Sequence, residues 1–157
     1  MPIPAIASVL VVCDGNHCRS PIGEALLKEG CSGELEVSSA GLTALEGVPP
    51  APEAQRLLRA ERGLDISGHR GRQVTPALVL SSDLILVMEE RQRAECERLA
   101  PSARGRVFLL GHWQPPAHRE IPDPFRKGPQ AYRKALEQIS QSVRDWLPRL
   151  VAQQRSS

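Results

Sequence analysis

The sequence predicts an α/β fold built on a parallel β-sheet. Two short runs, at residues 6–12 and 83–88, are almost wholly apolar, as expected of strands that are covered on both faces. Segments with apolar residues three and four positions apart separate such runs, and this alternation is typical of βαβ units. Ligands bind beyond the carboxyl ends of parallel strands, so we expect the functional residues at that edge of the sheet.

The first half of the chain is expected to contain two strands and two helices. In order, these are a strand at 6–12, a helix at about 21–29, a strand at 35–39, a loop at 40–52 and a helix at about 53–62. Ser20 suits the N-cap of the first helix and Pro21 its first position, where the missing N–H costs nothing. Gly63 ends the second helix.

The second half continues the alternation and ends in a long helix. Its expected elements are a polar connection at 65–73, a short helix capped by Thr75, a strand at 83–88, a helix at 89–99, a strand at 106–110, an irregular stretch at 112–129 and a helix at about 130–147. The last helix carries one apolar stripe at helical spacing. We expect a single domain over 1–157, with a frayed tail at 150–157.

Composition excludes several classes of function. The net charge of +2 gives no reason to expect a nucleic-acid partner, and no apolar run reaches the length of a membrane-spanning helix. The four cysteines do not resemble a secreted disulfide framework, and neither they nor the four histidines show the spacing of a zinc site. We therefore expect a cytoplasmic protein with no metal, no other cofactor and no membrane insertion.

The most informative stretch runs from Cys13 to Pro21, between the first strand and the first helix. The N–H groups of a tight turn and the positive end of the following helix converge on one point, which creates an anion site. That site stabilises a thiolate on Cys13, and Arg19 can bind the same anion with a bidentate fork. A thiolate and an arginine in an anion site suit attack on a phosphate monoester.

The other residues of the loop strengthen this interpretation. A cysteine that ends a buried strand is usually a core residue, and Cys-x5-Arg alone is a weak signal. However, Gly15 permits close approach of the backbone, Asn16 tolerates a left-handed conformation and can brace the loop, and the Ser20 hydroxyl can donate a hydrogen bond to the thiolate.

A phosphate monoester also requires an acid that protonates the departing oxygen. Asp123, in Ile121-Pro122-Asp123-Pro124-Phe125, is the best candidate because two prolines stiffen its segment at the same sheet edge. Phe125 would form a wall for an aromatic leaving group. The alternative is that Asp123 only occupies a turn, where Asp-Pro is common.

The remaining polar and sulfur residues are harder to interpret, and two of them, Cys18 and His69, have two possible roles. Cys18 either packs in the core or forms a protective disulfide with Cys13 under oxidation. His17 is expected at the rim of the pocket, and His69 is either a surface residue or a brace for the loop. Cys31 and Cys96 are expected to be structural, and the arginine cluster at 91–98 to be a solvated helix face.

These motifs resemble one family. Cys13-Asp14-Gly15-Asn16-His17-Cys18-Arg19-Ser20-Pro21 is similar to the signature of the low-molecular-weight protein tyrosine phosphatases. Four further segments follow that family in order: Ser39-Ala40-Gly41, residues 65–73, residues 84–88 and Asp123-Pro124.

The resemblance implies a three-layer sandwich, the phosphotyrosine phosphatase I-like fold, with four parallel strands and helices on both faces. It implies that Cys13 is the nucleophile, that Arg19 binds the phosphate, and that Asp123 is general acid and then base. It further implies a phosphate-binding loop formed by Asp14, Gly15, Asn16, His17, Cys18 and Ser20. Ser39 and His69 would brace this loop, which favours the brace as the role of His69.

The segment 111–127 is most similar to bacterial members of the family, which act with tyrosine autokinases of capsule or exopolysaccharide export. A phosphotyrosine protein, and among these such a kinase, is therefore the expected partner. The sequence departs from the common pattern in three places: at Asp14, at His17, and at Phe125-Arg126, which stand in place of two tyrosines. If Asp14 points into the pocket it opposes the phosphate, and if it points outward it only shapes the entrance.

Two rival functions use the same scaffold. An arsenate reductase would bind arsenate at Cys13 and relay a disulfide through further cysteines, but Cys96 stands alone in its segment. A catalytically silent phosphotyrosine-binding module would not need Cys13, Arg19 and Asp123 together.

Overall fold

The computed structural model describes residues 6–155, with side chains to Val151. Its strands are β1 (Ser8–Cys13), β2 (Glu36–Gly41), β3 (Leu84–Val87) and β4 (Val107–Leu109). Its α-helices are α1 (Arg19–Cys31), α2 (Pro52–Arg62), α3 (Pro76–Ser81), α4 (Glu90–Leu99) and α5 (Pro129–Arg155). Short 3₁₀ turns follow α4 and β4, at Pro101–Ala103 and Pro116–His118.

The four strands form one parallel sheet in the order β2-β1-β3-β4. Alternate residues of each strand point to opposite faces, because side chains alternate along a strand. Val9, Val11 and Leu86 pack with α1, α2 and α5, whereas Leu10 and Val87 pack on the face that α3 and α4 cover. The predicted four-stranded sheet with helices on both faces is thus confirmed.

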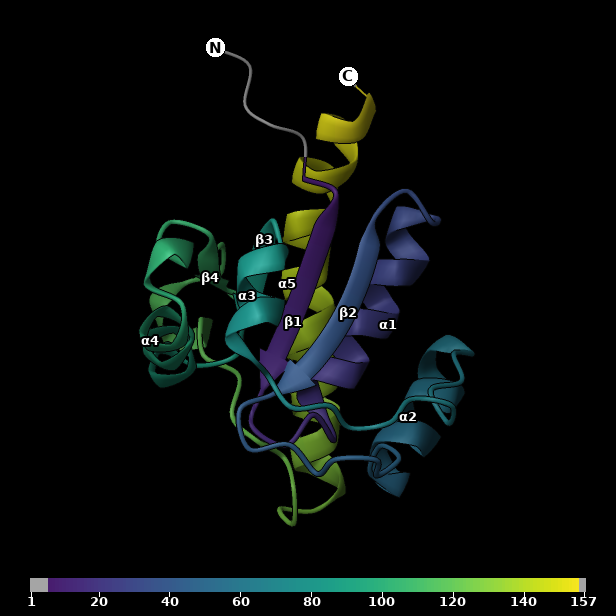
Figure 1. The fold of residues 1–157 in the computed structure, drawn as a ribbon. Helices are drawn as coiled ribbons and strands as arrows, with labels where there is room; N and C mark the ends of the chain where they lie inside the picture. Colours follow the sequence, from purple (N-terminus) through teal and green to yellow (C-terminus); the bar gives the residue numbers. More distant parts are fainter. Residues whose placement is uncertain (1–5, 156–157) are drawn as a thin grey trace.

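The carboxyl ends of the strands lie at one edge of the molecule. In Figure 1 the arrows of β1 and β2 point to the lower edge, away from the C-terminal end of α5. The loops after β1, β2 and β4 gather at this edge, so segments far apart in the sequence meet there. This agrees with the expected position of the functional residues.

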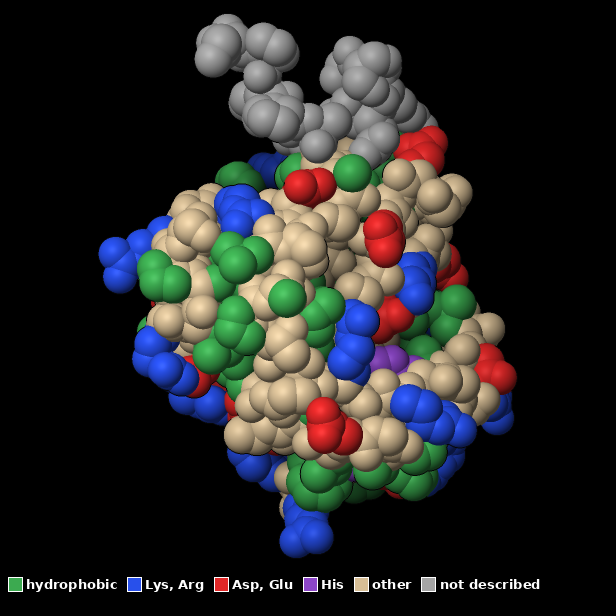
Figure 2. Space-filling model, viewed as in Figure 1, with side chains coloured by type: hydrophobic (Ala, Val, Ile, Leu, Met, Phe, Trp, Pro, Cys, Tyr) green, Lys and Arg blue, Asp and Glu red, His purple; other side chains and the backbone are tan. Residues whose placement is uncertain are grey.

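One side of the molecule carries charged side chains of both signs (Figure 2). On the side shown in Figure 2, Lys and Arg side chains alternate with Asp and Glu, as the nearly balanced net charge suggests. Within residues 6–155, no helix has the length and apolar character needed to cross a membrane.

Two predicted helix ends are wrong. α1 starts at Arg19, with Cys18 and not Ser20 at the N-cap, so Pro21 is its third residue. The Ser20 hydroxyl is occupied elsewhere, as described below. α5 runs eight residues beyond the predicted end at 147, through Pro148 to Arg155. The expected tail at 150–157 therefore begins within a helix, and residues 156–157 lie outside the described part of the chain.

Candidate active site

The loop between β1 and α1 is built so that its carbonyl groups point away from its centre. Each carbonyl oxygen from Cys13 to Cys18 contacts a donor outside the loop's concave side. The donors are the N–H groups of Leu42, Thr43, Leu45, Ala51 and Ile22, at 2.9–3.3 Å, and the His69 ring, 3.4 Å from the oxygen of Asn16. Because N–H and C=O of a peptide point in opposite directions, the N–H groups face the centre, as an anion site requires.

Asn16 braces this loop from within. It is fully buried and has a φ of 52°, the left-handed conformation that the sequence suggested for it. Its side-chain amide donates to the hydroxyls of Ser20, at 2.8 Å, and Ser39, at 2.9 Å. Its amide oxygen accepts from the backbone N–H of Arg72 at 2.9 Å. The side chain thus ties the loop to the start of α1, to β2 and to the 65–73 connection.

Glu24 and His69 in turn hold Ser39 and Asn16 in place. The Ser39 hydroxyl donates to Glu24 at 2.5 Å, and Nδ1 of His69 lies 3.8 Å from the same carboxylate oxygen. Burial lowers the pKa of His69, although Glu24 opposes this effect, so its ring is neutral at pH 7. His69 therefore lies where a brace for the loop is expected, and not on the open surface.

The thiol of Cys13 lies at the base of the concave site. Cys13 is 2% exposed, and its Sγ is 3.0 Å from Oγ of Ser20. This contact and the bond from Asn16 occupy the Ser20 hydroxyl, which explains why Ser20 is not the helix cap. A hydroxyl at this distance can donate to a thiolate.

Arg19 is buried and faces several acceptors. Its Nη1 donates to Glu89 at 2.6 Å and to the carbonyl oxygen of Ile121 at 2.8 Å. Its Nη2 lies 3.4 Å from Asp14 and 3.9 Å from Asp123. These contacts hold the guanidinium beside the loop, between the loop and the segment that follows β4.

Asp14 turns toward α4. Its two carboxylate oxygens accept from both terminal nitrogens of Arg91 and, at 3.0 Å, from the side-chain amide of Gln92. Burial alone would raise the pKa of Asp14, but the bonds from Arg91 and Gln92 and the charges of Arg91 and Arg19 lower it below its usual value. Asp14 is therefore a charged carboxylate at the edge of the site, with its negative charge paired.

The loops enclose a cavity of about 230 Å³ in front of Cys13. It is lined by Cys13–Gly15, His17–Arg19, Thr43, Leu45, Asp123 and Phe125. The carboxylate of Asp123 is 45% exposed and reaches the cavity from the chain beyond β4. One of its oxygens accepts from the N–H of Phe125 at 3.0 Å, which fixes the local turn.

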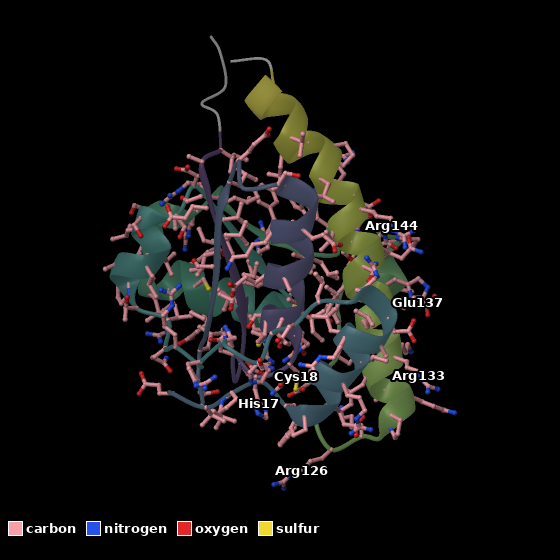
Figure 3. All side chains as sticks on the ribbon, turned by 90° about the vertical axis from the view of Figure 1, so that its right-hand side faces the viewer. His17, Cys18, Arg126, Arg133, Glu137 and Arg144 are labelled. Carbon is pink, nitrogen blue, oxygen red and sulfur yellow. The ribbon has the colours of Figure 1, made fainter. Side chains whose placement is uncertain are left out.

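The mouth of the cavity is largely apolar and aromatic. The rings of His17 and Phe125 meet edge to face, with centroids 5.5 Å apart, and Leu45 is exposed nearby. Figure 3 shows His17 and Cys18 at the lower end of the molecule, with Arg126 beyond them. The guanidinium of Arg126 lies 5.1 Å from the centre of the Phe125 ring. These rings give the mouth of the cavity a surface that an aromatic group can pack against.

The remaining cysteines are buried free thiols. Cys18 packs in the core, with its sulfur 3.6 Å from the hydroxyl of Tyr132, and burial raises its pKa to about 11. Cys18 therefore has the core packing that one of its two interpretations expects, and the protective disulfide with Cys13 stays a prediction. Cys31 and Cys96 lie in the cores on opposite faces of the sheet, where structural cysteines are expected.

Sequence reasoning missed three residues that follow β3: Glu89, which is the N-cap of α4, and Arg91 and Gln92 in its first turn. The sequence predicts a solvated helix face for Arg91, and its side chain is indeed 60% exposed, but its guanidinium also binds Asp14 and Glu89. Arg98 does form such a surface pair, with Glu95 one turn earlier. A signal was available, since polar residues that directly follow a buried parallel strand lie at the functional edge of the sheet.

The arrangement suits one kind of chemistry. A thiol lies at the base of a ring of N–H groups, a guanidinium lies beside it, and a carboxylate enters the same cavity from another loop. Such a site can bind a tetrahedral oxyanion, attack it with sulfur and exchange a proton with the group that leaves. Within residues 6–155, no group of three or more His, Cys, Asp and Glu side chains is arranged to hold a metal ion.

Comparison with known proteins points to the same chemistry. Residues 8–156 match the family model of low molecular weight phosphotyrosine protein phosphatases. The chain is 44% identical over 147 residues to the probable low molecular weight protein-tyrosine-phosphatase EpsP of Ralstonia nicotianae, covering 94% of this chain and 98% of EpsP. It is 43% identical to the phosphatase Wzb of Salmonella typhimurium, covering 93% and 95%.

Solved structures show the same fold. The tyrosine phosphatase Wzb from Escherichia coli K30, crystallised with sulphate, superposes with a TM-score of 0.86 at 39% identity, over 92% of this chain and 99% of Wzb. Vibrio vulnificus Wzb in complex with benzylphosphonate superposes with a TM-score of 0.85 at 35% identity, over 93% of this chain and all of that one.

Proposed function

Because the chain belongs to the low-molecular-weight protein-tyrosine phosphatases, we propose that it hydrolyses phosphotyrosine through a cysteinyl-phosphate intermediate on Cys13. It is a protein-tyrosine phosphatase of the Wzb and EpsP type, and its substrates are phosphotyrosine proteins. We further propose that its physiological substrate is a bacterial tyrosine kinase of exopolysaccharide production, and that it acts in the cytoplasm.

In the first step the Cys13 thiolate attacks phosphorus. The loop N–H groups and Arg19 bind the nonbridging phosphate oxygens, and the S–P bond forms as the P–O bond to tyrosine breaks. Asp123 gives its proton to the departing phenolic oxygen. His17, Leu45 and Phe125 contact the tyrosine ring at the mouth of the cavity.

In the second step water replaces the sulfur. Asp123, now a carboxylate, takes a proton from a water molecule that attacks phosphorus, and the S–P bond breaks to return the thiolate. Ser20, 3.0 Å from the sulfur, stabilises that thiolate as the leaving group. Inorganic phosphate is released, and Asp123 carries the proton needed for the next cycle.

One observation carries this proposal: Cys13, Arg19 and Asp123 line the same cavity. The first two come from the β1–α1 loop, and Asp123 comes from a segment about a hundred residues later that lies at the same sheet edge. Asp123 approaches Arg19 to 3.9 Å, so a phosphate bound by Arg19 lies within reach of the carboxylate.

The test is hydrolysis of p-nitrophenyl phosphate and of a phosphotyrosine peptide by the wild type and by Cys13→Ser. We expect Cys13→Ser to lose activity by at least about 10³-fold, since the step it removes is the covalent one. Cys96→Ser, which removes a buried thiol on the other face of the sheet, is the matched control. Full activity in Cys13→Ser would contradict the proposal.

Two further measurements separate the rival functions. Rapid quenching and mass spectrometry of the wild type should find one phosphoryl group on Cys13. Thiol-dependent reduction of arsenate without hydrolysis of phosphotyrosine would identify a reductase, and a phosphopeptide that binds without turnover would identify a binding module. For the physiological substrate, dephosphorylation of a purified tyrosine kinase is compared with that of phosphoserine proteins.

A further inference from the structure

Asp14 presents an electrostatic problem for the proposed reaction. It follows the nucleophile directly, and its Oδ2 is 3.4 Å from Nη2 of Arg19, the group proposed to bind phosphate. A carboxylate so close to Arg19 competes with a phosphate dianion for the same donors and repels it. Something must hold this charge away from the site.

Arg91 does so through a two-point contact. Its Nη1 donates to Oδ1 of Asp14 at 3.0 Å, and its Nη2 donates to Oδ2. The same Nη2 lies 3.1 Å from Oε2 of Glu89, the other carboxylate that contacts Arg19 closely. A single guanidinium therefore partly neutralises two of the three carboxylates near Arg19.

The place that receives Asp14 is fixed independently of Arg91. Gln92 is fully buried, and its side-chain oxygen accepts from the N–H groups of Met88 and Glu89, at 2.9 and 3.0 Å, as the capping box of α4. Its amide nitrogen consequently points at Asp14, to which it donates at 3.0 Å. The start of α4 is thus shaped to hold a carboxylate from the β1–α1 loop.

We propose that Arg91 is a positioning residue of this enzyme, which binds the Asp14 carboxylate and so keeps Arg19 available to the substrate phosphate. The inference rests on the proposed function of the same cavity. Arg91 is not one of the residues that line the cavity. It reaches the site through its contact with Asp14, which does line it. Without Arg91, Gln92 still holds one oxygen of Asp14, but the charge of the carboxylate is no longer neutralised and competes more strongly with phosphate for Arg19.

The test is a double-mutant cycle with Arg91→Met and Asp14→Asn. We expect Arg91→Met to raise KM for p-nitrophenyl phosphate and the inhibition constant of inorganic phosphate by about tenfold, with a smaller change in kcat, since charged residues in contact are energetically coupled. The Arg91→Met/Asp14→Asn enzyme should recover most of this loss, because the charge that Arg91 neutralised is gone.

Two controls make the result specific. Arg98→Met removes another arginine–carboxylate pair of the same helix, the one with Glu95, in which the Arg98 side chain is 67% exposed. It should leave KM and the inhibition constant of phosphate unchanged. Arg91→Lys retains the charge without the two-point contact and should lie between the wild type and Arg91→Met. It also replaces Arg91→Met as the test if that protein does not fold.

The proposal is overturned if Arg91→Met matches Arg98→Met, or if Asp14→Asn fails to restore phosphate binding in the Arg91→Met background. Calorimetric titration with inorganic phosphate provides a readout that does not require turnover. If the wild type binds phosphate but does not hydrolyse phosphotyrosine, the proposed function fails, and the titrations still decide the role of Arg91.

Discussion

In the proposed mechanism the carboxyl group of Asp123 is first a general acid and then a general base. How much the acid role contributes to the rate depends on the leaving group. A phenol departs poorly without a proton, whereas p-nitrophenol departs well as an anion. We expect Asp123→Ala to reduce kcat for a phosphotyrosine peptide by about 10²–10⁴-fold, the usual contribution of general acid catalysis, and to reduce it less for p-nitrophenyl phosphate.

The measurement is kcat for both substrates in Asp123→Ala and in the control Glu95→Ala, which removes a surface carboxylate paired with Arg98. A fall by the same factor on both substrates would show that Asp123 does not protonate the leaving oxygen. It would then act on substrate binding or on Arg19, from which it lies 3.9 Å.

Single residues also show where sequence reasoning reached its limit. Gly15, Asn16 and Ser20 each have a use in an anion site, so roles for them could be predicted without coordinates. The orientation of Asp14 could not be predicted in this way, because it depends on Arg91 and Gln92, which lie more than seventy residues away in the sequence. Only the register of β1 against β3 brings these side chains together.

At the scale of elements, the end of β2 supports the loop through close backbone contact. Gly41 bonds to Arg72 and Val74 through its own N–H and C=O, each at 2.8 Å. A Cβ on Gly41 would lie 2.4 Å from the carbonyl oxygen of Asp14 and 2.8 Å from the nitrogen of Asn16. These atoms are backbone, so they cannot move aside without distorting the phosphate-binding loop.

We therefore expect Gly41→Ala to reduce kcat/KM by at least about tenfold and to lower the free energy of unfolding by about 1–3 kcal/mol, the usual cost of overpacking. Gly68→Ala is the control, because its Cβ would meet no atom within 4 Å. The measurements are kcat/KM and urea unfolding. Wild-type values of both in Gly41→Ala would mean that the loop tolerates displacement.

The elements themselves were predictable where one physical signal dominated. Buried parallel strands are nearly all apolar, so β1 and β3 were evident, and Thr75 caps α3 as expected, accepting from the N–H of Leu78 at 3.1 Å. The predicted start of α1 is wrong because the hydroxyl of Ser20, which looks like a helix cap in the sequence, bonds to the side chains of Cys13 and Asn16 instead. Tertiary contacts had overridden a local preference.

At the scale of the whole molecule, topology made the site predictable. Parallel strands place the ends of β1 and β4 at one edge, and so the meeting of Cys13 and Asp123 follows from the order of elements. The full extent of α5 did not follow from the order of elements, since the helix continues through Pro148, a residue that is usually unfavourable inside a helix. Burial decides the matter, since Leu150 is 1% exposed and belongs to the core that α1, α2 and α5 share.

This burial gives the last prediction. Leu150→Ala should lower the free energy of unfolding by about 2–5 kcal/mol, as removal of a buried leucine usually does. Turnover of p-nitrophenyl phosphate by the folded enzyme should be unchanged, because the C-terminal end of α5 lies opposite the edge of the sheet to which β1 and β2 point (Figure 1). Gln141→Ala, at an exposed position of the same helix, should change neither property. If instead the chain frays from residue 150, Leu150→Ala will unfold at the same urea concentration as Gln141→Ala, and the last turns of α5 contribute nothing to the core.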